Sequence, residues 1–105
     1  MAFRVETTRT AEAEALEAFA WFCEHRSFEY ATEWYNGLME ALYTLGESPG
    51  RCPLAPENEM FVQEIRHLLY ARNRTKYRIL FTINRDLVYV LRIRHGAMQT
   101  LSPED

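Results

Sequence analysis

The chain has 105 residues, of which 48% are hydrophobic, 26% charged and 13% aromatic, a composition that excludes a disordered or low-complexity protein. This length supports one hydrophobic core, so we expect a single domain over residues 1–105. No segment resembles a membrane span or a signal peptide, and two cysteines are too few for a disulfide scaffold, so we expect a cytoplasmic protein without a membrane partner.

The charges are divided between the two halves of the chain. The net charge of −3 alone argues against a nucleic-acid-binding protein. Residues 1–50, however, hold three Lys or Arg against nine Asp or Glu, whereas residues 62–98 hold eight against two. This division predicts an acidic half and a basic half with different partners, although opposite charges that only solvate two faces and attract each other would give the same division.

A strand and two helices are predicted in the acidic half. Residues 3–7 alternate apolar with polar side chains, which is typical of a strand. The first helix begins after an N-cap at Thr8 or Thr10 and extends to about Glu24. Its expected buried stripe has helical spacing: Leu16, Phe19, Phe22 and Cys23.

The second helix has the clearest periodicity in the sequence. Ser27 is its expected N-cap, and Gly46 and Pro49 end it. Its apolar residues recur at steps of three and four: Ala31, Trp34, Tyr35, Leu38, Ala41, Leu42 and Leu45. Because only His25, Arg26 and Ser27 separate the helices, we expect an antiparallel helical hairpin.

The basic half predicts three strands after an irregular connection. Residues 46–62 contain three prolines and no period, and we expect them to cross from the helices to the sheet. Strands are expected at 63–70, 77–83 and 87–94. The whole order is strand, helix, helix, three strands, which predicts an α+β fold with the helical hairpin packed on a mainly antiparallel sheet.

A period of two sets the expected faces of the last two strands. The residues expected to meet the helices are Tyr77, Ile79, Phe81, Ile83, Leu87, Tyr89, Leu91 and Ile93. The opposite face then carries Arg78, Arg92 and Arg94, and Arg66 and His67 on the preceding strand extend it. Guanidinium groups bind phosphate or carboxylate through paired hydrogen bonds, so this face is the best candidate for chemistry. Alternatively, the arginines keep an open sheet face soluble or pair internally with Glu64 and Asp86.

Other kinds of site are not expected. The three histidines have no metal-ligand spacing with each other or with the cysteines, and the chain has no glycine-rich phosphate loop. The acidic run at Glu12, Glu14 and Glu17 is expected to be a solvated helix face. We therefore expect neither a metal nor a cofactor.

Three segments resemble the RelE/ParE toxin superfamily: EIRHLLY at 64–70, YRILF at 77–81 and DLVYVLRIRHGA at 86–97. The order of elements resembles that superfamily over the whole chain. The residues themselves match its usual sequence only over about 62–97. The resemblance implies the toxin of a bacterial type II toxin–antitoxin pair, which inhibits growth and is neutralised by a cognate antitoxin.

The superfamily has two branches with different targets. RelE-like members are endoribonucleases that hold mRNA in the ribosome and need no metal. In that case the matching candidate catalytic residues are Arg66, Arg78, Arg94 and His95. ParE-like members poison DNA gyrase without a catalytic centre of their own. In that case the residues implied to contact the target or the antitoxin are Arg66, Arg78, Arg92 and Arg94.

Two departures from the RelE-like pattern favour the ParE-like branch. Met98 stands where RelE-like enzymes carry an arginine after the final glycine, and no tyrosine follows Tyr89. The ending of the last strand also resembles ParE-like members more closely. A RelE-like endoribonuclease and a non-toxic binding module on the same fold stay open as alternatives.

Overall fold

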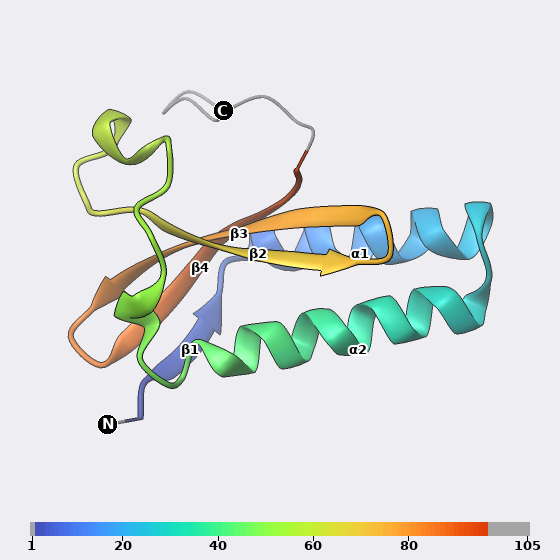
Figure 1. Ribbon diagram of the computed structural model, residues 1–105, viewed down its shortest axis with the longest axis horizontal. Helices are drawn as coiled ribbons and strands as arrows, with labels where there is room; N and C mark the ends of the chain where they lie inside the picture. The colour runs from blue at the N-terminus through green and yellow to red at the C-terminus, as the bar shows by residue number, and fades with distance from the viewer. Residues whose placement is uncertain (1, 97–105) are drawn as a thin grey trace.

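The computed structural model describes residues 2–96, which form two helices packed on one face of a four-stranded sheet (Figure 1). The elements in chain order are β1 (Arg4–Thr7), α1 (Arg9–His25), α2 (Phe28–Thr44), the 3₁₀ turns η1 (Pro49–Arg51) and η2 (Asn58–Met60), β2 (Arg66–Arg72), β3 (Thr75–Asn84) and β4 (Leu87–His95). The expected α+β order is confirmed. No helix among residues 2–96 has the length and apolarity needed to cross a membrane.

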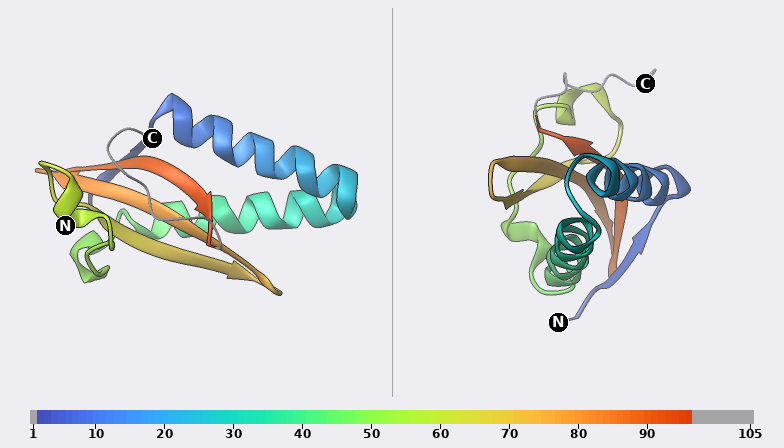
Figure 2. Two further views of the ribbon diagram at one scale, coloured as in Figure 1. Left: turned by 90° about the horizontal axis from the view of Figure 1, so that it is seen from above. Right: turned by 90° about the vertical axis from the view of Figure 1, so that its right-hand side faces the viewer.

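The helical hairpin begins at the predicted caps. The Thr8 hydroxyl accepts a hydrogen bond from the Ala11 N–H at 3.0 Å, and the Ser27 hydroxyl accepts one from the Tyr30 N–H at 3.0 Å. Each contact satisfies an N–H that has no partner inside its own helix. The two helices run antiparallel across the sheet (Figures 1 and 2).

The strands are ordered β1-β4-β3-β2 in the sheet. β2 and β3 pair antiparallel, as do β3 and β4, whereas β1 pairs parallel with the first half of β4. The first strand of the chain therefore lies beside the last one, although the helical hairpin, β2 and β3 separate them in sequence. The expectation of a mainly antiparallel sheet is confirmed.

The main core lies between the hairpin and the sheet. Its largest fully buried side chains come from α2, from the residue that caps its C-terminal end and from the central strands: Trp34, Leu38, Leu45, Ile79, Phe81, Val88 and Val90. On α1 the predicted stripe is partly wrong, because Leu16 is 57% exposed and the buried positions are Ala11, Ala15, Ala18 and Phe22. Alanines on this face let the α1 backbone approach the strands closely.

Gly37 allows a similar close approach between α2 and β2. The Tyr70 hydroxyl donates a hydrogen bond to the Trp34 carbonyl at 2.8 Å, and a β-carbon at Gly37 would overlap that hydroxyl. A larger residue at position 37 would therefore displace the Tyr70 ring from the helix.

A β-bulge changes the phase of β4. Leu80 pairs with Arg92 and Phe81 with Val90, so Leu91 is an extra residue on β4. Before the bulge the buried residues are Val88 and Val90, not the predicted Leu87, Tyr89 and Leu91; after it, Ile93 is buried as predicted. The prediction that every second residue faces the helices is therefore wrong for most of β4 and right for β3.

The connection between α2 and β2 covers part of the sheet face that lies away from the helices. Ala55, Ile65 and Leu80 form a second buried cluster there, with Phe61 and Leu91 packed against it. The Ile65 carbonyl accepts from the Ala55 N–H at 2.8 Å, and the Ile65 N–H donates to Asn58 Oδ1 at 2.8 Å. Because these groups bond within the connection, β2 starts at Arg66 and not at the predicted residue 63.

Candidate functional site

The side chain of Arg78 is held in a buried ion pair with Glu57. Its Nη1 donates to Glu57 Oε2 at 2.8 Å, and its Nη2 donates to Glu57 Oε1 at 2.6 Å. The Glu57 side chain is fully buried and that of Arg78 is 11% exposed. Arg78 does lie on the predicted face of β3, but two carboxylate oxygens already occupy its guanidinium group.

Glu57 belongs to this site although the sequence does not predict it. It lies in the aperiodic connection, just before η2, where neither a helical nor a strand period marks an inward-facing position. The alternative interpretation of the sequence is that the arginines pair internally, with Glu64 and Asp86 as partners. Internal pairing is confirmed for Arg78, but the partner is Glu57.

Arg92 lies elsewhere, against helix α1. Its Nε contacts both carboxylate oxygens of Glu14 at 3.1 Å, and its Nη2 donates to Glu14 Oε2 at 2.8 Å. The strand register places Arg92 opposite Leu80, so Arg92 does leave β4 on the predicted face, away from the main core. The bulge at Leu91 keeps it on that face, and its guanidinium group pairs there with Glu14 instead of staying open for a ligand.

Glu14 also caps the edge of β4 beyond the end of β1. The Ile93 N–H donates to Glu14 Oε1 at 2.9 Å, and the Thr8 hydroxyl donates to the Leu91 carbonyl at 2.9 Å. The Thr8 N–H donates to the Val90 carbonyl at 3.0 Å. The prediction that Glu14 belongs to a solvated helix face is therefore wrong. Its carboxylate accepts the hydrogen bond that the backbone of a neighbouring strand would accept at this edge.

Arg66 points toward η1, away from the Arg78 pair. Its Nη1 donates to the Cys52 carbonyl at 2.5 Å and to the Gly50 carbonyl at 3.3 Å, and its Nη2 pairs with Glu64 at 2.9 Å. Its register partner on β3 is Phe81, a residue of the main core, whereas Arg78 is on the opposite side of that strand. Arg66 therefore fastens the connection to the start of β2.

Arg94 and His95 line a groove between α1 and the ends of β3 and β4. The groove has a volume of about 390 Å³, and its aromatic lining includes Trp21, Phe22 and Tyr77. The His95 ring meets the Tyr77 ring edge-on at 5.3 Å between centroids. Arg94 is opposite Arg78 in the strand register, yet it lines this groove together with α1.

Three of the predicted guanidinium groups bind different carboxylates of the chain. Arg78 binds Glu57, Arg92 binds Glu14 and Arg66 binds Glu64. Arg94 and His95 line the groove beside α1. Among residues 2–96 no group of three or more His, Cys, Asp or Glu side chains is arranged to hold a metal ion. Met98 lies outside the described residues.

His67 lies beside the buried ion pair and shares its environment. Burial lowers the pKa of His67 below its usual value, the positive charge of Arg78 lowers it further, and Glu57 opposes this shift. Its Nδ1 atom is buried and has no hydrogen-bond partner among residues 2–96. The folded state therefore favours the neutral form of His67 more than the unfolded chain does.

This lowered pKa predicts that the protein loses stability in mild acid. The unfolded chain binds a proton at this histidine below about pH 6.5, whereas the folded chain resists protonation. The free energy of unfolding should therefore fall as the pH decreases from 7 to 5. Urea denaturation across this range should give a shallower fall for His67→Gln than for the wild type, and equal slopes would contradict this assignment.

Comparison with known proteins agrees with the fold described above. A family model described as the ParE toxin of the type II toxin–antitoxin system parDE matches residues 5–100. A solved structure described as the chromosomal ParDE toxin–antitoxin system from P. aeruginosa matches with a TM-score of 0.73 at 17% identity, over 90% of this chain and 96% of that one. No curated protein matches in a sequence search.

Proposed function

The chain belongs to the ParE toxin family of type II toxin–antitoxin systems, and on this premise we propose that it inhibits bacterial growth by poisoning DNA gyrase. A member of this family has a cognate antitoxin as its partner. Toxins of this superfamily act on either gyrase or ribosome-bound mRNA. Our proposal chooses gyrase as the target of this chain. Action on gyrase would take place in the cytoplasm.

The observation that carries the choice of gyrase is the internal pairing of the candidate catalytic arginines. A ribonuclease of the RelE-like kind needs cations that are directed at one phosphate. Arg78 and Arg66 instead donate to Glu57, Glu64 and backbone carbonyls within the chain. Breaking a buried ion pair to bind a phosphate leaves an uncompensated buried charge, which is strongly unfavourable.

The position of His95 supports the same choice. Its ring packs against Tyr77 in the α1 groove, whereas Arg66 lies at η1 and Arg78 lies under the connection. An acid or base must lie within hydrogen-bond reach of the group it serves. These three candidates do not surround one scissile bond, so binding a protein target accounts for the arrangement better than cleaving RNA.

The arginines expected to contact a target or an antitoxin are also divided by this geometry. Arg66, Arg78 and Arg92 bind carboxylates of the chain, and Arg94 lines the groove between α1 and the strands. We therefore place the contact role at Arg94 and its neighbours, and we give the other three a positioning role.

Induction of the protein in bacteria separates the possible functions. We expect growth to stop and an SOS-response reporter to rise within the first generation, while total mRNA stays intact. Co-expression of the small protein encoded beside the toxin gene is the matched control and should restore growth. Early mRNA cleavage without an SOS response would favour the ribonuclease, and unaffected growth would favour a non-toxic binding module.

A further inference from the structure

The turn between β2 and β3 gathers positive charge at one end of the molecule. Arg72, Arg74 and Lys76 belong to this turn and the strand ends beside it. Arg26 follows the last residue of α1 and joins them, because the turn lies at the same end of the molecule as the connection from α1 to α2 (Figures 1 and 2). We call these four residues the basic tip.

Tyr30 of α2 holds the basic tip together. The Arg26 guanidinium group lies over the Tyr30 ring, 4.9 Å from its centroid, and Asn73 Nδ2 donates to the Tyr30 hydroxyl at 3.5 Å. The hydrogen bond with Asn73 lowers the pKa of Tyr30 most, and burial opposes this shift. A hydrogen bond with Thr75 and the positive charges of Arg26 and Arg72 lower the same pKa further. One side chain therefore fixes the end of α1 against the strand turn.

Three cations of the basic tip have no carboxylate partner in the part of the chain that the structure describes. Arg72 pairs with Glu33 at 2.7 Å, whereas no ion pair within residues 2–96 involves Arg26, Arg74 or Lys76. All three of these side chains are exposed. They can therefore bind an anion without breaking an ion pair inside the protein.

The carboxylates near the connection between the helices face away from the basic tip. Glu24 comes two positions after the buried Phe22, and Glu29 comes two positions before the buried Ala31. Two positions correspond to about 200° around a helix, so both carboxylates lie on the side of the hairpin opposite the sheet. The negative charge of this region therefore does not cover the turn.

A phosphate backbone suits the basic tip better than the surface of a folded protein does. The residues between the cations of the turn are Asn73 and Thr75, which are polar. Protein interfaces draw most of their affinity from buried aromatic and apolar anchors, which this turn does not offer. Binding to a nucleic-acid backbone depends instead on how many cations meet phosphates.

We propose that the basic tip contacts the phosphate backbone of the DNA that gyrase holds, so that the toxin binds the gyrase–DNA complex more tightly than gyrase alone. The inference rests on the proposed function, because it takes gyrase as the target. With a net charge of −3 the chain should bind free DNA weakly, so gyrase must first place the toxin beside the duplex. Each cation that meets a phosphate releases a counterion, so salt should reduce the gain in affinity that DNA provides.

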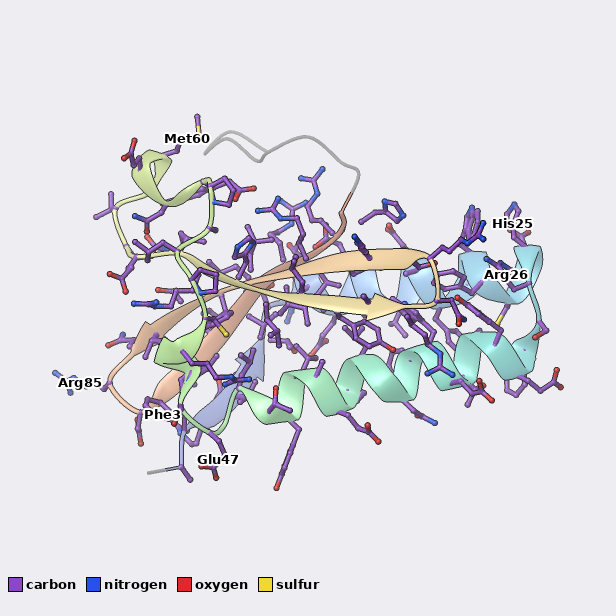
Figure 3. All side chains as sticks on the ribbon, in the orientation of Figure 1. Phe3, His25, Arg26, Glu47, Met60 and Arg85 are labelled. Atoms are coloured by element: carbon purple, nitrogen blue, oxygen red, sulfur yellow. The ribbon has the colours of Figure 1, made fainter. Side chains whose placement is uncertain are left out.

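The test compares the double variant Arg74→Ala with Lys76→Ala to a control that also removes two positive charges, Arg9→Ala with Arg85→Asn. Arg9 and Arg85 are exposed, and Figure 3 shows Arg85 at the opposite end of the molecule from Arg26. Asparagine suits position 85 because the backbone φ there is 57°. The readout is the Kd of fluorescently labelled toxin for purified gyrase by anisotropy, with and without linear DNA, at several salt concentrations.

The expected signature is a loss of the DNA-dependent part of binding alone. At low salt, DNA should lower the wild-type Kd for gyrase by about tenfold, and the Arg74 and Lys76 double variant should lose most of this gain. With DNA present, the slope of log Kd against log salt should decrease by about two, one for each phosphate contact removed. The Kd for gyrase without DNA should stay within about twofold of the wild type, and the control should keep both the gain and the slope.

Each other outcome has a separate meaning. An equal gain from DNA in the two double variants would overturn the inference and leave gyrase poisoning intact. Weaker binding to gyrase in the absence of DNA would also overturn it and would assign the basic tip to an acidic surface of gyrase. Failure of the wild-type chain to bind or poison gyrase would overturn the proposed function, and the inference with it. Melting curves of both variants confirm that the fold is retained.

Discussion

An Arg78→Ala variant is expected to lose about 3–5 kcal/mol of its free energy of unfolding, the usual cost of removing one partner from a buried ion pair. Glu57 is fully buried, and Arg78 supplies it with two hydrogen bonds at 2.8 and 2.6 Å. The substitution removes both bonds while the carboxylate stays in the protein interior. Urea denaturation followed by circular dichroism measures the difference.

Two further variants test the cause of this destabilisation. Arg74 is exposed in the turn between β2 and β3, so Arg74→Ala should change stability by less than about 0.5 kcal/mol. The double variant Glu57→Leu with Arg78→Met removes both charges and should recover most of the stability, because apolar side chains of similar volume often replace buried ion pairs without loss. A stable Arg78→Ala protein would contradict the buried pair and restore Arg78 as a surface contact residue.

A Glu14→Ala variant is expected to lose about 2 kcal/mol, because it removes charge-assisted hydrogen bonds and leaves a partly buried N–H without its acceptor. These hydrogen bonds join the Glu14 carboxylate to the Arg92 guanidinium group and to the Ile93 N–H. The variant should also loosen the edge of β4, so the amide proton of Ile93 should exchange faster with solvent.

Glu24→Ala is the matched control on the same helix, because Glu24 is exposed near its C-terminal end. Its stability should stay within about 0.5 kcal/mol of the wild type. Glu14→Gln retains an oxygen acceptor and removes the charge, so it should fall between Glu14→Ala and the wild type. Equal stability of Glu14→Ala and Glu24→Ala would show that α1 is not fastened to β4 through this carboxylate.

The sequence predicts the order of the elements because the signals for each are local. Ser27 caps α2 through its own hydroxyl, and the period of α2 marks Trp34 and Leu38 as buried. On β3, simple alternation correctly places Ile79 and Phe81 in the core. These features depend on neighbouring residues, so they can be recognised without knowledge of the rest of the fold.

The candidate site is less predictable because it depends on contacts between distant parts of the chain. The extra residue at Leu91 becomes visible only in the pairing of β4 with β3, and it changes which residues of β4 face the core, from Val88 and Val90 to Ile93. Glu57 comes from an aperiodic connection, 21 residues before Arg78. Such a carboxylate carries no sequence signal that distinguishes it from the exposed Glu59.

In the sequence the arginines have the pattern of a binding surface, because the contacts that cover them come from distant parts of the chain. A basic residue on the solvent side of a strand is a candidate for binding unless another element covers it. Here the connection covers Arg78 and α1 covers Arg92, so both stabilise the fold. Within the described residues 2–96, Arg94 and His95 line the groove beside α1, which the strand pattern alone does not reveal because α1 forms one of its walls.

Incubation of the purified protein with DNA gyrase, ATP and relaxed plasmid tests the proposed function most directly. Gyrase poisoning predicts loss of supercoiling and accumulation of linear plasmid after denaturation of the trapped enzyme, in proportion to the amount of toxin, with both effects reversed by the neighbouring small protein. Normal supercoiling at a large excess of the chain, together with cleavage of mRNA on ribosomes by the same preparation, would contradict the account.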